Sequence, residues 1–259
     1  PLNYTLGLAR AATEAGVRIF ENSRVTSYTR EDPSVVSTPK GSVKAAHVVL
    51  GCNGYLGDLE PRSAGKIMPI NNFMIATEPL GEERALELIN GRFGIHDTRF
   101  VVNYFRLSDD HRLLYGGGEN YRPGFPRDIA KFVRPYMIRM FPQLKDVNID
   151  HAWGGTLAVT VNRLPHVGRL EPNVYFAQGY SGHGISTATF AGKVIAEAVA
   201  GDSLALLHEA QELLRTGSMR GVGRDPRLTG AAFAEELSLA SAIEIALADI
   251  WREVLHIEQ

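Results

Sequence analysis

A glycine-rich stretch near residue 183 has features that suit it to ligand binding. An apolar run at 173–178 leads into Gly179-Tyr180-Ser181-Gly182-His183-Gly184, after which helix-forming residues begin. Glycine lets the backbone pass close to a ligand, and the first turn of a helix presents unpaired N–H groups with a partial positive charge. We therefore expect a strand, a turn and a helix start that together seat an electron-rich group.

Three side chains are candidates for direct contact with a substrate or cofactor. Tyr104 and Arg106 flank Phe105 on an expected strand, where aromatic rings could hold a cationic amine and the guanidinium could bind a carboxylate. The competing interpretation is that these are ordinary strand residues. His183 stands between two glycines, so either its ring faces a ligand or only its backbone matters.

The same turn also allows a serine hydrolase as an alternative. Residues 179–183 approach the G-x-S-x-G elbow, which would make Ser181 a nucleophile. His183 takes the place of the final glycine, and the histidines that remain downstream to serve as the base are His208 and His256.

Metal and thiol chemistry have less support. The pairs at 96–97 and 109–111 combine histidine with aspartate, but neighbours in sequence do not face one another as metal ligands do, so we expect no metal site. Cys52 has no basic neighbour that would activate its thiol, so we expect a small buried residue.

Composition narrows the class of protein. The 259 residues are 44% hydrophobic and 22% charged, enough for a sizeable core. A formal charge of -2 gives no electrostatic reason to expect nucleic acid or an anionic membrane as partner. No apolar run approaches the roughly 20 residues that span a bilayer. A single cysteine cannot form an internal disulfide, so the default expectation is the reducing cytoplasm.

The elements that would position these residues fall into an interrupted domain, an inserted domain and a tail. The first part combines a helix with β-rich runs, the last of which meets a turn at 51–54 where backbone could approach a ligand. Alternating strands with polar turns then indicate an antiparallel sheet, and an amphipathic stripe near the end predicts a helical tail. We expect helices at 6–15, 82–90, 129–141 and 185–199, strands at 17–20, 25–28, 35–37, 43–50, 70–77, 100–107, 112–116, 157–161 and 173–178, and a turn at 165–168.

An ordered set of motifs carries a family resemblance. Residues 152–158, 162–168 and 179–186 resemble the C-terminal half of D-amino-acid-oxidase-like flavoproteins, within which the gamma-glutamylputrescine oxidoreductases are most similar. The likeness extends back through 116–118, 51–54 and 17–25, so it covers roughly residues 1–201. It implies an α/β (α+β mixed) fold, with a partial FAD-binding Rossmann-like domain at 1–61 and 154–201. The substrate domain would be the antiparallel insertion at 62–153, and the helical tail at 202–259 stays unmatched.

The resemblance also implies which residues bind FAD. Val25 would lie by the adenine, the turn at 51–54 near the middle of the cofactor, and residues 154–156 and 182–186 around the isoalloxazine. The implied cofactor-binding residues are Val25, Cys52, Asn53, Gly54, Gly154, Gly155, Thr156, Gly182, His183, Gly184, Ile185 and Ser186.

The implied enzyme is an FAD-dependent oxidoreductase. It would oxidise a C–N bond of an amine or amino acid, of the gamma-glutamylputrescine kind, to an imine. Hydride would pass to the flavin, and molecular oxygen would reoxidise it. The protein would mainly orient and desolvate the reactants.

Besides the unmatched tail at 202–259, one departure from the family pattern bears on cofactor binding. The strand with G-x-G-x-x-G that holds the pyrophosphate is not in the sequence, so the chain should retain FAD poorly unless another chain supplies a missing N-terminal segment. The alternative is a truncated non-catalytic remnant or a partner subunit.

Overall fold

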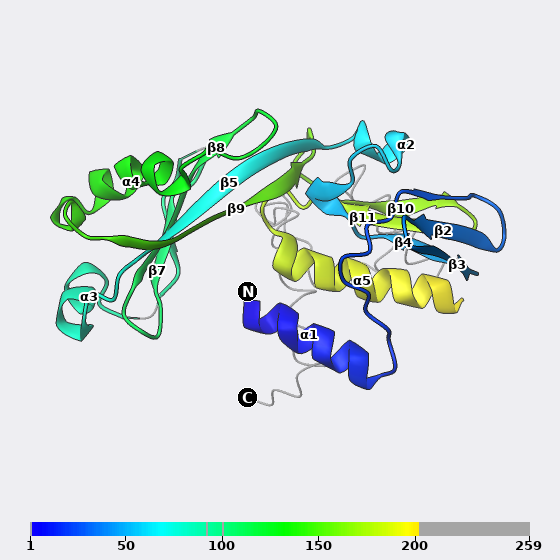
Figure 1. Cartoon of the computed structure of the whole chain (residues 1–259), viewed down its shortest axis with the longest axis horizontal. Helices are drawn as coiled ribbons and strands as arrows, with labels where there is room; N and C mark the ends of the chain where they lie inside the picture. Colours follow the sequence, from blue (N-terminus) through cyan, green and yellow to red (C-terminus); the bar gives the residue numbers. More distant parts are fainter. Residues whose placement is uncertain (1, 92, 100, 202–259) are drawn as a thin grey trace, which may run out of the picture. The chain divides into compact units, whose positions relative to one another are not determined.

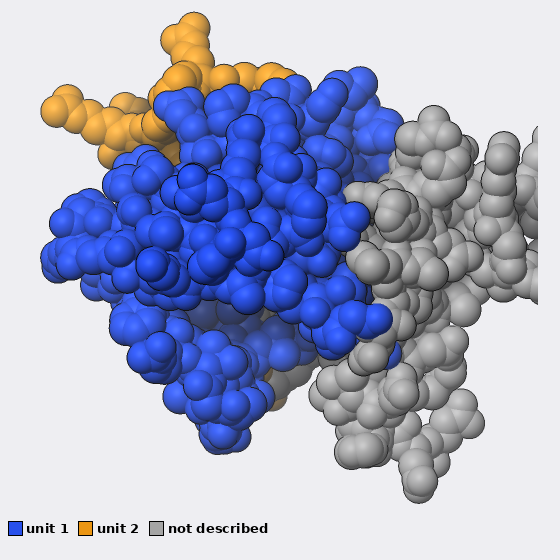
Figure 2. Space-filling view, turned by 90° about the vertical axis from the view of Figure 1, so that its right-hand side faces the viewer, with its two compact units in different colours: residues 1–67, 160–259 blue, residues 68–159 orange. Residues whose placement is uncertain are grey.

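The structure is a computed structural model that describes residues 2–91, 93–99 and 101–201. It divides into two compact units, which are coloured separately in Figure 2. Unit 1 consists of residues 1–67 and 160–259, and unit 2 of residues 68–159.

Unit 1 holds two small sheets and the two longest helices of the described chain (Figure 1). One sheet has the antiparallel order β1-β2-β3, and the other has the order β10-β11-β4, in which β11 and β4 are parallel. The elements are α1 (Leu2–Glu14), β1 (Ser27–Tyr28), β2 (Ser34–Thr38), β3 (Gly41–Ala45), β4 (Val48–Leu50), η1 (Asn53–Tyr55), α2 (Pro61–Ala64), β10 (His166–Glu171), β11 (Val174–Gln178) and α5 (Gly184–Ala200).

The central strand β11 is buried on both faces, which explains its unbroken apolar run. Tyr175 and Ala177 belong to a cluster with the buried residues of α5. Val174 and Phe176 belong to a second cluster with the buried residues of β4, and Tyr28 packs against it. Small residues on α5 permit close packing on the sheet.

Unit 2 is one antiparallel sheet with a helix packed on it. The strand order is β6-β7-β8-β5-β9, and α4 contacts β5, β8 and β9. A single apolar cluster fills the space between them, and Asp128 caps α4 by accepting a hydrogen bond from Lys131 N at 2.8 Å. The elements are β5 (Met68–Thr77), α3 (Glu82–Leu88), β6 (Ile95–His96), β7 (Tyr104–Leu107), β8 (Leu113–Asn120), α4 (Ile129–Met140), η2 (Pro142–Leu144) and β9 (Ile149–Val159).

The expected α/β (α+β mixed) fold with antiparallel sheet is confirmed, and the differences lie in single elements. The strand expected at 17–20 is wrong: the segment is irregular, and Val17 and Phe20 are exposed. The turn expected at 165–168 is also wrong, because residues 166–168 belong to β10 and pair with β11. The strand expected at 43–50 is split between β3 and β4, which join different sheets. The predicted tail lies outside the described residues.

None of the helices in the described ranges combines the length and apolar character needed to cross a membrane.

Candidate functional site

The turn between β11 and α5 requires glycine for two different reasons. Gly179 has φ +72, and an added Cβ there would lie 2.5 Å from Thr160 Cγ2. Gly182 has φ +101, but no heavy atom of the described residues lies within 4 Å of an added Cβ. The first glycine is therefore required by packing and conformation, and the second by conformation alone, beside open space.

The start of α5 leaves backbone donors available. The His183 carbonyl accepts hydrogen bonds from Thr187 N and, at 2.7 Å, from Thr187 Oγ1. Within the described ranges, no residue accepts from the amides of Gly184, Ile185 and Ser186. His183 is exposed and caps the helix with its backbone only. The helix start is therefore a concentrated source of positive potential.

The second predicted turn meets the first. Asn53, which has φ +45, accepts a hydrogen bond from Gly179 N at its Oδ1, at 3.0 Å. Both turns follow the carboxyl ends of β4 and β11, which are parallel and adjacent, so their proximity follows from the topology. Cys52 and Gly54 are half-buried beside Asn53, and burial raises the pKa of the Cys52 thiol.

Ser181 is not placed as a nucleophile. Its φ of +51 resembles a strained elbow, but the residue is buried, and its Oγ donates to Gly179 O and accepts from Thr160 N. Among the residues that the structure describes, no histidine contacts this hydroxyl. The hydrolase alternative therefore lacks its base in this part of the chain, and the candidate bases His208 and His256 lie outside the described residues.

Polar residues beside the glycine turn were not predicted from the sequence. The buried Gln178 donates to Ser63 O at 2.8 Å, and its Nε2 lies 3.2 Å from His166 Nδ1. Burial, with a smaller effect from Lys66, lowers the pKa of His166. The one indication of this polar site in the sequence was Gln178, which ends an otherwise apolar run.

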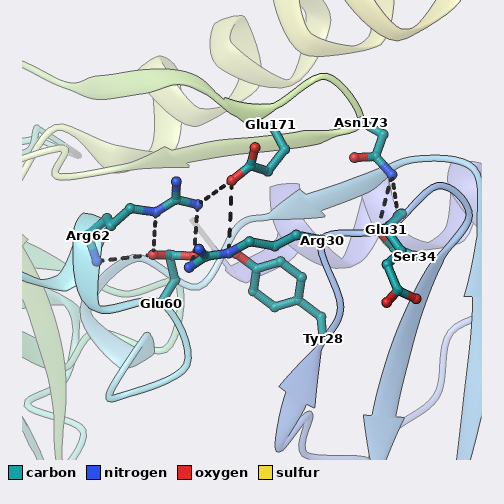
Figure 3. Close-up of polar contacts among 8 residues, drawn as sticks. All are labelled: Tyr28, Arg30, Glu31, Ser34, Glu60, Arg62, Glu171 and Asn173. Atoms are coloured by element: carbon teal, nitrogen blue, oxygen red, sulfur yellow. Dashed lines mark hydrogen bonds and ion pairs between the residues drawn. The ribbon is translucent and has the colours of Figure 1, made fainter.

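A buried carboxylate lies on the segment that follows the Asn53 turn (Figure 3). Glu60 is only 1% exposed, caps α2, and accepts hydrogen bonds from Tyr28 Oη, Arg30 Nη2 and Arg62. Arg62 Nη2 also lies 3.0 Å from Glu171 Oε1 on β10. We call these five residues the Glu60 cluster.

Two arginines and two glutamates make the Glu60 cluster neutral by formal charge. Burial alone would raise the pKa of Glu60, but the hydrogen bonds from Arg62 and Tyr28 outweigh it and bring the pKa to about 2. The carboxylate is therefore ionised at neutral pH.

In unit 2, the candidate substrate residues share one face of β7. Tyr104 pairs with Gly116 across the sheet, where an added Cβ would lie 2.2 Å from the tyrosine ring. The Tyr104 hydroxyl donates to Asn72 Oδ1 at 2.5 Å, and burial raises the pKa of this phenol. Arg106 is exposed. Phe105 points to the opposite face and packs against Tyr115 and Phe141.

The remaining predicted cofactor residues are distributed over both units. Gly154, Gly155 and Thr156 lie on β9 of unit 2, where Thr156 Oγ1 donates to Asn71 Oδ1 at 2.8 Å. An added Cβ at Gly154 would lie 2.7 Å from the Phe73 ring. Val25 is half-buried just before β1 in unit 1. No group of three or more histidine, cysteine, aspartate or glutamate side chains suited to a metal occurs in the part of the chain that the structure describes.

Comparison with known proteins extends these observations. Residues 1–198 match the family model DAO, described as FAD dependent oxidoreductase. Gamma-glutamylputrescine oxidoreductase of Escherichia coli (strain K12) is 43% identical over 204 residues, which covers 78% of this chain and 48% of that protein. Sarcosine oxidase subunit beta of Arthrobacter sp is 27% identical over 218 residues, which covers 80% and 51%.

A solved structure also matches this chain. L-proline dehydrogenase from P. horikoshii matches with a TM-score of 0.65 and 25% identity, over 85% of this chain and 61% of that one. The chain spans about half the length of the curated relatives it matches. The resemblance inferred from the motifs is confirmed, and the chain belongs to the DAO family of FAD-dependent oxidoreductases.

Proposed function

We propose that this chain supplies flavin- and substrate-contacting elements of an oxidoreductase that converts a C–N bond of an amine or amino acid to an imine, with molecular oxygen as electron acceptor. The observation that carries the proposal is the start of α5, where three amides lack an acceptor in the described ranges and Gly182 borders open space. Family membership supplies FAD as the group for this position.

The residues of this turn fit an electron-rich ring system. Backbone N–H groups at 184–186 are donors only, and they suit the oxygen and nitrogen atoms at one edge of a flavin. The absence of a side chain at Gly182 leaves room for a flat group to approach. Asn53 would contribute from the second turn, since its side chain already holds the backbone of Gly179.

Bound FAD would supply the redox chemistry of the proposed reaction, as the acceptor of a hydride from the carbon next to the substrate nitrogen. The role of the chain is electrostatic. The N-terminal end of α5 stabilises negative charge placed beside it, and its dipoles are fixed by folding before any reaction.

Substrate recognition would use the outer face of β7. The exposed Arg106 can bind a carboxylate through two parallel hydrogen bonds, and the Tyr104 phenol is held in place by Asn72. A substrate with both an amine and a carboxylate, of the gamma-glutamylputrescine kind, offers a partner for each group.

A second candidate is a subunit of a larger oxidoreductase assembly. No G-x-G-x-x-G occurs in this sequence, and the Arthrobacter relative is named as a subunit. We therefore place pyrophosphate binding on a complementing segment.

The test compares the chain alone with the chain carrying an added upstream strand and G-x-G-x-x-G turn. We expect visible flavin absorbance and amine-dependent release of hydrogen peroxide from the complemented protein, with Arg106→Met raising KM for carboxylate-bearing amines. Ser181→Ala should keep the activity. A complemented protein without flavin, or labelling of Ser181 by a fluorophosphonate, would overturn the proposal.

A further inference from the structure

The geometry points to Glu60 as a positioning residue: its buried carboxylate anchors the segment 52–67, so that the Asn53 side chain can hold the backbone of the glycine turn at Gly179. The relevance of this anchor to flavin rests on the function proposed above. The placement of the turn itself does not.

Within the described residues, the segment from Cys52 to Ile67 pairs with no strand. It consists of turns, the 3₁₀ turn η1 and the four-residue helix α2, with hydrogen bonds such as Leu56 N to Asn53 O and Leu59 N to Leu56 O. A chain of turns lacks the ladder that fixes a strand to its sheet, so its position depends on a few contacts with the rest of unit 1.

Polar contacts hold this segment at three points. At one end, Asn53 Oδ1 accepts from Gly179 N, and at the other, Ser63 O accepts from Gln178 Nε2. Both of these partners belong to the junction of β11 with the glycine turn. Between them, Glu60 joins the segment to Tyr28, which lies on β1, and to Arg30, which follows β1 in the sequence.

The middle contact is the strongest of the three by its chemistry. Glu60 is ionised, is almost fully removed from solvent and accepts charge-assisted hydrogen bonds, whereas the two end contacts are neutral. Arg62 continues the chain of ion pairs to Glu171 on β10 (Figure 3). Loss of the carboxylate would release the middle of the segment, because the two arginines would then pair with Glu171 alone.

The first experiment needs no cofactor. Amide exchange, resolved by NMR, is compared in the full chain and in Glu60→Ala and Glu60→Gln variants. The control is Asp128→Ala, which removes another acidic helix cap, from α4 in unit 2. We expect exchange at Gly179 to rise at least about tenfold in Glu60→Ala, more than at the β11 amides, and to stay unchanged in the control.

Glu60→Gln distinguishes positioning from capping and also serves if Glu60→Ala does not fold. Its amide oxygen can still accept from Arg62 N, but it cannot pair ionically with Arg30. We expect an intermediate rise at Gly179. Equal increases at Gly179 and throughout β11, or no increase at Gly179, would overturn the proposal.

Flavin titration of the complemented protein then tests the link to function. We expect a Kd for FAD about tenfold higher in Glu60→Ala, with a changed visible flavin spectrum, and no change in Asp128→Ala. If FAD does not bind any variant while Gly179 exchange responds as expected, the proposed function fails and the positioning role stands. If FAD binds all variants equally while Gly179 exchange is unchanged, the positioning role fails.

Discussion

Two ionic clusters, one in each unit, combine arginine with acidic side chains in opposite arrangements. In unit 1 a carboxylate stands at the centre, since Glu60 is 1% exposed between half-exposed arginines. In unit 2 an arginine stands at the centre, since Arg112 is 18% exposed and bonds Asp110, Asp150 and Thr77 O. We call these four residues the Arg112 cluster.

The two clusters differ in which charged group is buried away from solvent. A buried carboxylate without its partners cannot recover hydration, whereas Asp110 and Asp150 remain accessible to solvent. Burial of the central group predicts that unit 1 depends on its cluster far more than unit 2 does.

The largest effect should come from removing the central acid. Glu60→Ala removes the carboxylate that Tyr28 and both arginines share, leaves the arginines with Glu171 alone and uncaps α2, so we expect the free energy of unfolding to fall by about 3 kcal/mol. Urea denaturation followed by circular dichroism measures this change. Asp110→Ala, which removes an exposed acid from the Arg112 cluster, is the matched control and should have little effect. Equal losses would remove the contrast between the clusters.

Acid should weaken the Glu60 cluster in a defined pH range. The pKa of Glu60 is lowered from 4.5 to about 2, so its contribution is fully present above pH 4.5 and is lost as the pH falls toward 2. Most of the difference in unfolding free energy between the native protein and Glu60→Gln should therefore disappear over this range. Urea midpoints of both proteins between pH 6 and 2 provide the comparison, and a difference independent of pH would contradict it.

A smaller effect is expected at the turn that the Glu60 cluster supports. Asn53→Gly keeps the positive φ but loses the hydrogen bond from Gly179 N, at a cost of about 1 kcal/mol. Asn53→Ala also strains the backbone and should cost about 1 kcal/mol more. Thermal or urea denaturation of the two variants separates these contributions. Identical stabilities would show that the backbone at Asn53 carries no strain.

The smallest effects should follow exchange of arginine for lysine. Arg62→Lys loses the planar fork that bridges Glu60 and Glu171, with an expected cost of about 1 kcal/mol or less because the side chain is 44% exposed. Arg112→Lys should lose the simultaneous contacts to Asp110 and Asp150 and become more sensitive to salt. Denaturation at low and high salt tests both. A larger loss for Arg112→Lys than for Glu60→Ala would reverse the ranking.

Local patterns in the sequence were sufficient to predict the framework of the candidate site. A run of apolar residues followed by spaced glycines predicted β11, its turn and α5, because these three elements follow one another directly in the sequence. Alternation with polar turns predicted the antiparallel sheet of unit 2 for the same reason. The family resemblance then supplied the cofactor, which no local pattern could identify.

Contacts between distant segments could not be predicted in this way. Glu60 lies in a polar stretch, and its burial depends on Tyr28, 32 residues away, and on Arg62 paired with β10. Gln178 and Ser63 are joined across 115 residues. Residues 17–20 show the converse: they have β-forming composition but no strand partner among the described residues.

The parallel pairing of β4 with β11 also has a consequence for the order of folding. The hydrogen bond that joins the turns after these strands closes a loop of 126 residues, and all of unit 2 lies within that loop. Unit 2 is contiguous, so it can form as soon as it leaves the ribosome, whereas the central sheet of unit 1 must wait for β11. Early collapse of the inserted unit shortens the unstructured span that β4 has to bridge, and so lowers the entropy lost when the sheet closes.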